Sequence, residues 1–145
     1  MASYNMTVTS PRAPAEVFAY LARFSNAAEW DPGVVSGCSL ADEEGPRLGS
    51  VYRLVVRFGG REVPLDYEVV ELVPSYRVVL RADNGLVRST DTITVTSVPD
   101  GGCSVDYQAV LEAKKARAVL GPVLDWAFRR TGDRARAGLL AKLAA

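Results

Sequence analysis

The stretch GPVLDWAFRRTGDRARAGLLAKLAA, from Gly121 to Ala145, is the only long helical pattern in the sequence. Apolar and small residues recur in it at intervals of three and four, which places them on one face of a helix. Pro122 suits a helix start, because proline is tolerated at the first helical position. We therefore predict a long C-terminal helix whose inner face consists of Leu120, Leu124, Ala127, Phe128, Thr131, Ala135, Gly138, Leu139, Lys142 and Leu143.

The middle of that face is unusually thin, because Thr131, Ala135 and Gly138 lie between larger residues at its two ends. Small side chains at such a place either let a neighbouring element approach closely or leave space for something else. The segment from Ala113 onward is also basic, with eight Lys or Arg against two Asp. These charges form a solvated helix face or attract an acidic partner such as an acyl-carrier protein.

Composition limits the classes of function. The 145 residues suit one domain spanning 1–145, and the 17 basic and 17 acidic residues cancel, which argues against a general nucleic-acid binder. The sequence has no signal-peptide pattern and no apolar run of the roughly 20 residues needed to cross a bilayer. We therefore expect a cytoplasmic protein without integral membrane association, in which Cys38 and Cys103 stay reduced. The absence of histidine excludes a Ser-His-Asp mechanism, and no metal-ligand spacing or cofactor motif is present.

The chain ahead of the long helix alternates between apolar and polar residues, as half-buried strands do. A short helix from Pro14 or Ala15 and a turn of helix around Asn26 to Trp30 interrupt the pattern. The strands are expected at Tyr4–Ser10, Val34–Leu40, Ser50–Phe58, Arg61–Leu72, Tyr76–Asp83, Val87–Val98 and Cys103–Glu112.

The connections and one irregularity define the shape of this sheet. Gly59-Gly60 and Asn84-Gly85 are hairpin signals, so neighbouring strands should pair antiparallel. The adjacent Val69 and Val70 break the alternation, which indicates a β-bulge and a bent strand. We predict an α+β protein: a curved antiparallel seven-stranded sheet wrapped around the long C-terminal helix, with two short helices between strands 1 and 2.

This arrangement resembles the SRPBCC or START-like superfamily, also called the helix-grip or birch-pollen-allergen fold, and within it the polyketide cyclase/dehydrase and lipid-transport group. The residues that carry the resemblance are the opening strand with Ser10-Pro-Arg-Ala-Pro-Ala-Glu-Val-Phe, the Glu29-Trp30-Asp31-Pro32-Gly33 turn, the Asp91-Thr92-Ile93-Thr94-Val95 strand, the Asp100-Gly-Gly102 hairpin and the closing helix. The resemblance implies a cavity between sheet and helix that holds a lipid, sterol, hormone or polyketide. Its motifs are specific for the fold and poorly specific for function.

Asp91 and three tyrosines are the candidate polar residues of such a cavity. Asp91 is in phase with Ile93 and Val95, so it should point inward, where burial favours an uncharged carboxyl group. It could serve as an acid or base together with Tyr107, or it could only make a structural hydrogen bond. The other expected ligand-binding residues are Trp30, Tyr52, Leu54, Val56, Tyr67, Leu80, Ile93, Phe128, Thr131 and Ala135.

Three hypotheses of function follow. The first is a module that binds or carries a hydrophobic small molecule. The second is a cofactor-independent polyketide aromatase/cyclase that uses Asp91 and the tyrosines for aldol cyclisation and dehydration. The third is a regulatory protein whose basic helix face and Trp126 form a protein interface, an arrangement that also suits a homodimer.

Overall fold

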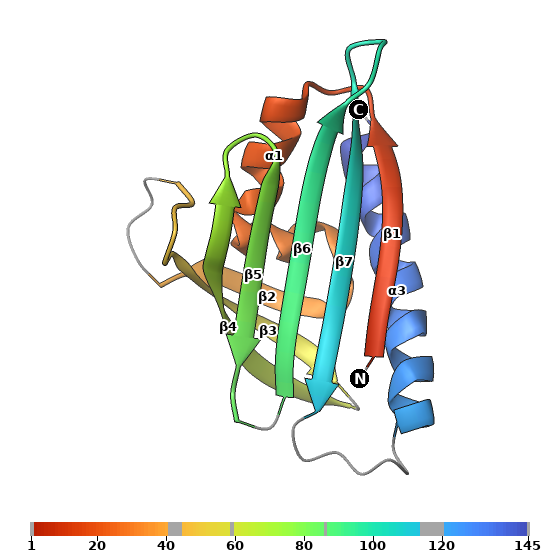
Figure 1. The fold of residues 1–145 in the computed structure, drawn as a ribbon. Coiled ribbons are helices and arrows are strands. Elements are labelled where there is room, and N and C mark those ends of the chain that lie inside the picture. The colour runs from red at the N-terminus through yellow and green to blue at the C-terminus, as the bar shows by residue number, and fades with distance from the viewer. Residues whose placement is uncertain (1, 41–44, 59, 86, 114–120, 145) are drawn as a thin grey trace.

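The fold is a curled antiparallel sheet with three α-helices on its inner side (Figure 1). It is taken from a computed structural model that describes residues 2–40, 45–58, 60–85, 87–113 and 121–144. Within these ranges the side chains of residues 58, 113 and 121–131 are not described. The strands are β1 (Ala2–Ser10), β2 (Val34–Ser39), β3 (Val51–Phe58), β4 (Arg61–Val73), β5 (Arg77–Asp83), β6 (Val87–Ser97) and β7 (Cys103–Ala113).

The helices lie where the sequence indicates, with one addition. They are α1 (Pro14–Ala22), α2 (Ala27–Trp30) and α3 (Gly121–Leu143), and a short 3-10 helix η1 (Phe24–Asn26) joins the first two. Proline opens α1, and Glu16 lies in its first turn, where a negative charge suits the helix dipole. The predicted α+β class with two short helices between the first two strands is therefore confirmed.

The seven strands form one sheet in the order β1-β7-β6-β5-β4-β3-β2. Every neighbouring pair is antiparallel, and β1 closes the meander by pairing with β7 from Ala2↔Leu111 to Ser10↔Cys103. The register between β4 and β5 shifts between Val69 and Glu71, which confirms the bulge expected near Val70. A second shift lies between Val34 and Ser36 on β2, where the sequence had given no sign of one. Both irregularities increase local twist and so help the sheet to curl.

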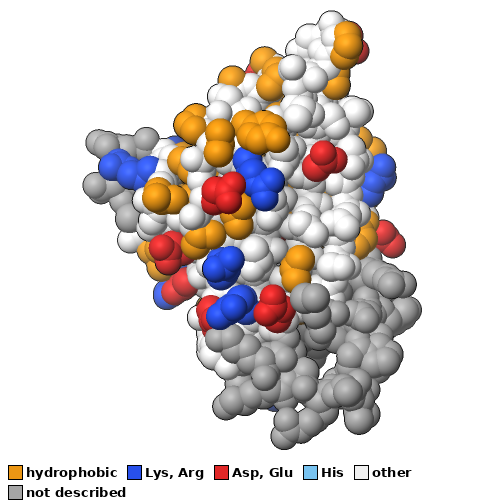
Figure 2. Space-filling model, in the orientation of Figure 1, with side chains coloured by type: hydrophobic (Ala, Val, Ile, Leu, Met, Phe, Trp, Pro, Cys, Tyr) orange, Lys and Arg blue, Asp and Glu red, His pale blue; other side chains and the backbone are white. Residues whose placement is uncertain are grey.

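The concave side of the sheet carries the core. Side chains that alternate inward on β3 to β7 pack against α1, η1, α2 and the described part of α3, and this cluster contains no buried Lys or Arg among the residues whose side chains are described. The convex side carries charged pairs such as Arg53 with Asp66 and Arg77 with Glu71. Figure 2 shows this convex face, where charged and apolar side chains lie mainly over β4 and β5.

Helix α3 is fastened to the edge strand β1 at two points. The Tyr4 hydroxyl donates to Asp133 Oδ1 at 2.7 Å, and the buried Ser10 hydroxyl donates to the Leu143 carbonyl oxygen at 2.7 Å. Between these bonds, Leu139 is completely buried. No helix among the described residues is both long enough and apolar enough to cross a membrane.

Candidate functional site

The site is built on a row of residues that crosses three neighbouring strands. Tyr67 on β4 lies opposite Ala82 on β5, and Ala82 lies opposite Ser89 on β6. Because the alanine between them is small, the Tyr67 side chain reaches across it, and its hydroxyl donates to Ser89 Oγ at 2.9 Å. Two residues further along β6, the same face carries Asp91. The strand alternation and one small residue thus place a hydroxyl group next to a carboxyl group.

Strand β7 supplies the second partner of Asp91. In the β6–β7 pair, Asp91 lies opposite Ala109 and Ile93 lies opposite Tyr107, so Tyr107 is a diagonal neighbour of Asp91. Its hydroxyl donates to Asp91 Oδ2 at 2.5 Å, and the Ser89 hydroxyl donates to Asp91 Oδ1 at 3.2 Å. We call Tyr67, Ser89, Asp91 and Tyr107 the polar chain; all four are buried.

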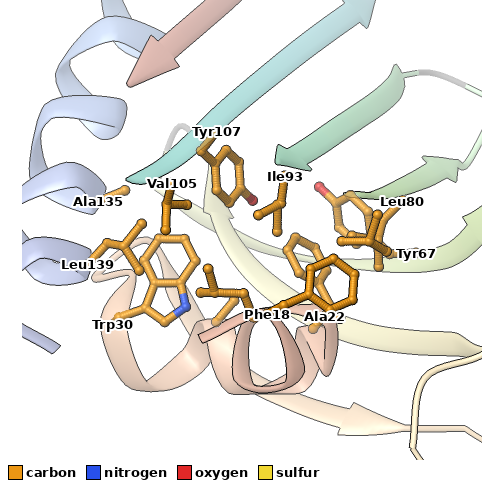
Figure 3. Packing of buried hydrophobic residues seen from close by; sticks show 14 of the residues in the cluster. Phe18, Ala22, Trp30, Tyr67, Leu80, Ile93, Val105, Tyr107, Ala135 and Leu139 are labelled. Atoms are coloured by element: carbon orange, nitrogen blue, oxygen red, sulfur yellow. The ribbon is translucent and has the colours of Figure 1, made fainter. Parts of the chain in front are cut away.

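Apolar and aromatic side chains surround the polar chain. Phe24 meets the Tyr67 ring edge-to-face at 4.9 Å between centroids, and Trp30 meets the Tyr107 ring in the same manner at 5.7 Å. In Figure 3 the hydroxyl ends of Tyr107 and Tyr67 point toward one another on either side of Ile93. The polar groups therefore come together inside an otherwise apolar interior.

Burial controls the protonation of these groups. It raises the pKa of Asp91 from 3.8 to about 6, and the nearby charge of Asp31 acts in the same direction. The hydrogen bonds from Tyr107 and Ser89 favour the ionised carboxylate and oppose the rise. Burial, followed by the charge of Asp91, raises the pKa of both Tyr67 and Tyr107 well above its ordinary value. The tyrosines are thus neutral donors, whereas Asp91 exchanges its proton close to neutral pH.

Asp31 is a second acid close to this interior. It follows directly after α2, and its Oδ1 accepts a hydrogen bond from the Gly33 backbone N–H at 2.8 Å, which confirms the expected turn. Burial raises its pKa, and its charge also raises that of Asp91, Tyr67 and Tyr107. From the sequence, Asp31 is expected only as part of a turn. It is half-buried because it follows α2 directly, and the position of α2 against the rest of the protein is not visible in the sequence.

The residues that were expected to bind a ligand mostly lie in one buried cluster. Asp91 and Tyr107 are hydrogen-bonded to each other. Asp91 accepts hydrogen bonds from the side-chain hydroxyl groups of Ser89 and Tyr107. The cluster also holds Trp30, Tyr52, Leu54, Tyr67, Leu80, Ile93 and Ala135, with Val56 half-buried against it. Phe128 and Thr131 lie outside the side chains that the structure describes, as does Trp126.

The thin middle of α3 has two different surroundings. A Cβ atom built at Gly138 would overlap the carbonyl oxygen of Trp30, so this glycine permits a close approach of α2 and leaves no space. Ala135, one turn earlier, faces the core cluster. Of the two alternatives for the small residues of α3, Gly138 therefore shows the close approach of a neighbouring element and not free space. The spacing predicts Lys142 on the inner face of the helix, but its side chain is exposed. Its Nζ lies 3.5 Å from Glu29 Oε1.

A separate groove of about 320 Å³ lies on the convex face. Its lining is largely polar and comes from β1, β5, β6 and β7: Asn5, Met6, Thr7, Arg77, Thr92, Thr94, Asp106, Tyr107 and Gln108. Within it the Thr7 hydroxyl donates to Asp106 Oδ1 at 2.7 Å. This polar surface does not suit a hydrophobic ligand. Among the described residues, no group of three or more His, Cys, Asp or Glu could hold a metal ion.

A curled seven-stranded sheet, closed by a C-terminal helix and carrying polar groups on its inner face, defines a helix-grip protein. The model of the family described as polyketide cyclase / dehydrase and lipid transport matches residues 1–145, and the chain belongs to this family. A search of curated protein sequences finds no significant match.

Solved structures confirm the fold. A START superfamily protein from Mycobacterium smegmatis is 14% identical in sequence with a TM-score of 0.79, and the alignment covers 99% of this chain and 97% of that protein's chain. An aromatase/cyclase from a Streptomyces strain is 15% identical with a TM-score of 0.75, covering 97% and 92% respectively. A protein from Thermobifida fusca is 19% identical with a TM-score of 0.67, covering 99% and 95%. At these identities the likeness extends to the fold alone.

Proposed function

We propose that the protein binds a hydrophobic small molecule, such as a polyketide, lipid or aromatic compound, between the curled sheet and α3. The observation that carries this proposal is the polar chain inside an apolar interior. Apolar walls with a few convergent polar groups are typical of small-molecule sites, in which the polar groups orient the ligand. The family to which the chain belongs supports the same class of ligand.

Ala135 provides a test of this binding site. Its side chain is buried on the inner face of α3, whereas Ala137, two residues later, is exposed. We expect Ala135→Leu to weaken binding of a lipophilic fluorescent dye at least about tenfold, because the larger side chain enters the ligand's space. Ala137→Leu is the matched control and should bind as the unaltered protein does. If Ala135→Leu folds and binds the dye equally well, the proposed site is wrong.

A second candidate function is catalysis of aldol cyclisation and dehydration, as in an aromatase/cyclase. The buried carboxyl group of Asp91 favours it, because burial raises its pKa to about 6 and a group with this pKa can take up and release a proton at neutral pH. Tyr107, hydrogen-bonded to it, lies beside the same reaction centre. Asp91 would remove a proton from a methylene group between two carbonyls, and the resulting carbanion would add to a third carbonyl carbon. Tyr107 would donate its hydroxyl hydrogen bond to the developing oxyanion. The new C–C bond closes the ring, and the alkoxide then takes the proton from Asp91 to give the aldol product. Loss of its hydroxyl group together with a hydrogen from the neighbouring carbon, as water, forms the double bond.

Turnover of a poly-β-keto substrate distinguishes catalysis from binding alone. We expect Asp91→Asn to abolish cyclisation and Tyr107→Phe to reduce it, with both variants retaining dye binding. An unchanged cyclisation rate in either variant would remove that residue from the mechanism. Spontaneous cyclisation of the same substrate without protein is the baseline for each rate.

Protein partners and location are part of the same proposal. A substrate tethered to an acyl-carrier protein would bring an acidic partner to the basic C-terminal segment. Arg134, Arg136 and Lys142 are exposed on the described part of α3, although Lys142 already contacts Glu29. A homodimer through the same helix is the alternative use of this surface. Both uses fit a cytoplasmic protein.

A further inference from the structure

When Asp91 is ionised, it places a negative charge in the interior, and no basic group among the described residues contributes to its pKa. Asp91 is 7% exposed, and the other buried members of the polar chain, Tyr67, Ser89 and Tyr107, are neutral, as is the buried Ser10. Asp31, half-buried, adds a second acid that interacts electrostatically with Asp91. A carboxylate that is removed from water strongly favours a nearby cation, because the low dielectric no longer screens it.

Three arginines of the sheet pair with acids other than Asp91. Arg53 binds Asp66 at 2.7 Å, Arg77 binds Glu71 at 3.0 Å, and Arg88 binds Asp83 at 3.1 Å. The residues directly opposite Asp91 on β5 and β7 are the apolar Leu80 and Ala109. The polar groups around it are hydroxyls: Tyr107 from β7, Ser89 on its own strand, and Tyr67 from β4 through Ser89. From the helical side, the charged group that acts on Asp91 is the acid Asp31.

The hydrogen bonding of Asp91 is also incomplete. An ionised carboxylate offers about four acceptor positions, and Asp91 accepts one bond on each oxygen. Further N–H donors could bind on the remaining positions. The edge-to-face pair of Trp30 and Tyr107 also places aromatic rings beside the hydrogen bond that Tyr107 donates to Asp91, and aromatic rings favour a nearby cation.

We propose that the ligand of this interior is an apolar molecule with a protonated amine, and that the amine pairs with the carboxylate of Asp91. This inference rests on the proposed function, since it names the charge of the ligand in the same site. The ammonium group supplies both the missing cation and the missing donors. A ligand with a carboxylate would instead place two like charges close together in the interior, which disfavours fatty acids.

Three ten-carbon probes that differ only in their polar end test the proposal: decylamine, decanol and decanoate. Binding of each to the full chain is measured by isothermal titration calorimetry at about pH 7.5, below the critical micelle concentration. We expect decylamine to bind at least about tenfold more tightly than decanol, and decanoate to bind most weakly. Lowering the pH to about 5 should weaken decylamine binding about tenfold and leave decanol binding unchanged, because Asp91 becomes neutral.

Two variants locate the effect. Asp91→Asn should remove the preference for the amine, whereas Asp106→Asn makes the same chemical change on the exposed face of β7 and should keep it. If none of the probes binds, the proposed function itself fails. If decanol or decanoate binds as tightly as decylamine, the binding function stands and the amine proposal is overturned. If Asp91→Asn still prefers the amine, the preference comes from another group and the proposal is overturned. If Asp91→Asn does not fold, the pH series on the unaltered protein tests whether Asp91 causes the preference.

Discussion

The carboxyl group of Asp91 should make the stability of the protein depend on pH in a particular direction. In the folded state its pKa is about 6, chiefly because of burial, whereas the ordinary value is 3.8. The folded protein therefore holds this proton between about pH 4 and pH 6, where the unfolded chain has released it. Stability is then lost as the pH rises through this window, and the loss is complete above about pH 7.

The size of the effect follows from the shift. A difference of about two pKa units, at 1.36 kcal/mol for each unit, amounts to roughly 3 kcal/mol between pH 4 and pH 8. Asp91→Asn removes the titrating group and keeps a side chain of similar shape. We therefore expect the variant to gain stability relative to the unaltered protein as the pH rises, by roughly 3 kcal/mol over this range.

Urea unfolding at one-unit steps from pH 4 to pH 8, followed by tryptophan fluorescence and by circular dichroism, measures the difference. Taking the difference between the two proteins cancels the carboxyl groups that do not interact with Asp91. Asp106→Asn is the control, because this residue is exposed and its removal should produce no comparable trend. A difference between Asp91→Asn and the unaltered protein that does not change with pH would refute the reasoning. A change of opposite sign would mean that the bonds from Tyr107 and Ser89 outweigh burial.

Other changes should affect the same interior. Tyr107→Phe removes one hydrogen bond that favours the ionised form, so the pKa of Asp91 should rise further and the stability transition should move to higher pH in the same urea series. Gly138→Ala places a methyl group against the Trp30 carbonyl, so we expect the free energy of unfolding to fall by roughly 1–3 kcal/mol, measured by thermal unfolding. An unchanged melting temperature would contradict this prediction. Leu139→Ala empties a completely buried position and should cost roughly 2–5 kcal/mol in urea, whereas a loss below about 1 kcal/mol would mean that this part of α3 does not hold the core.

Much of the fold follows from local patterns. Alternation located the strands because each has one face in the core, and turn residues such as Asn84-Gly85 made consecutive strands neighbours. The same alternation placed Asp91 and Tyr107 on the inner face. The bulge near Val70 was also visible, since two adjacent valines cannot both face inward on a regular strand.

The partners within the site depend on register, which alternation does not provide. Tyr107 reaches Asp91 because it lies diagonally across β6 and β7, and a slip of one residue would turn it to the other face. The bond from Tyr67 to Ser89 needs the small Ala82 between them. The surroundings of Gly138 and Asp31 depend on how α2 packs against α3. They could not be predicted, because this packing consists of contacts between residues far apart in the sequence.

The pairing of β1 with β7 has a consequence for folding during synthesis. Ala2 has its strand partner at Leu111, so β1 is synthesised well before the strand that pairs with it. Until β7 has left the ribosome, β1 has an unpaired backbone on the side that β7 will occupy, and its anchors to α3 come later still. Closing so long a loop is entropically costly, and contacts of this separation slow folding. We infer that the meander from β2 to β7 assembles first and that β1 is added last, although it precedes these strands in the sequence.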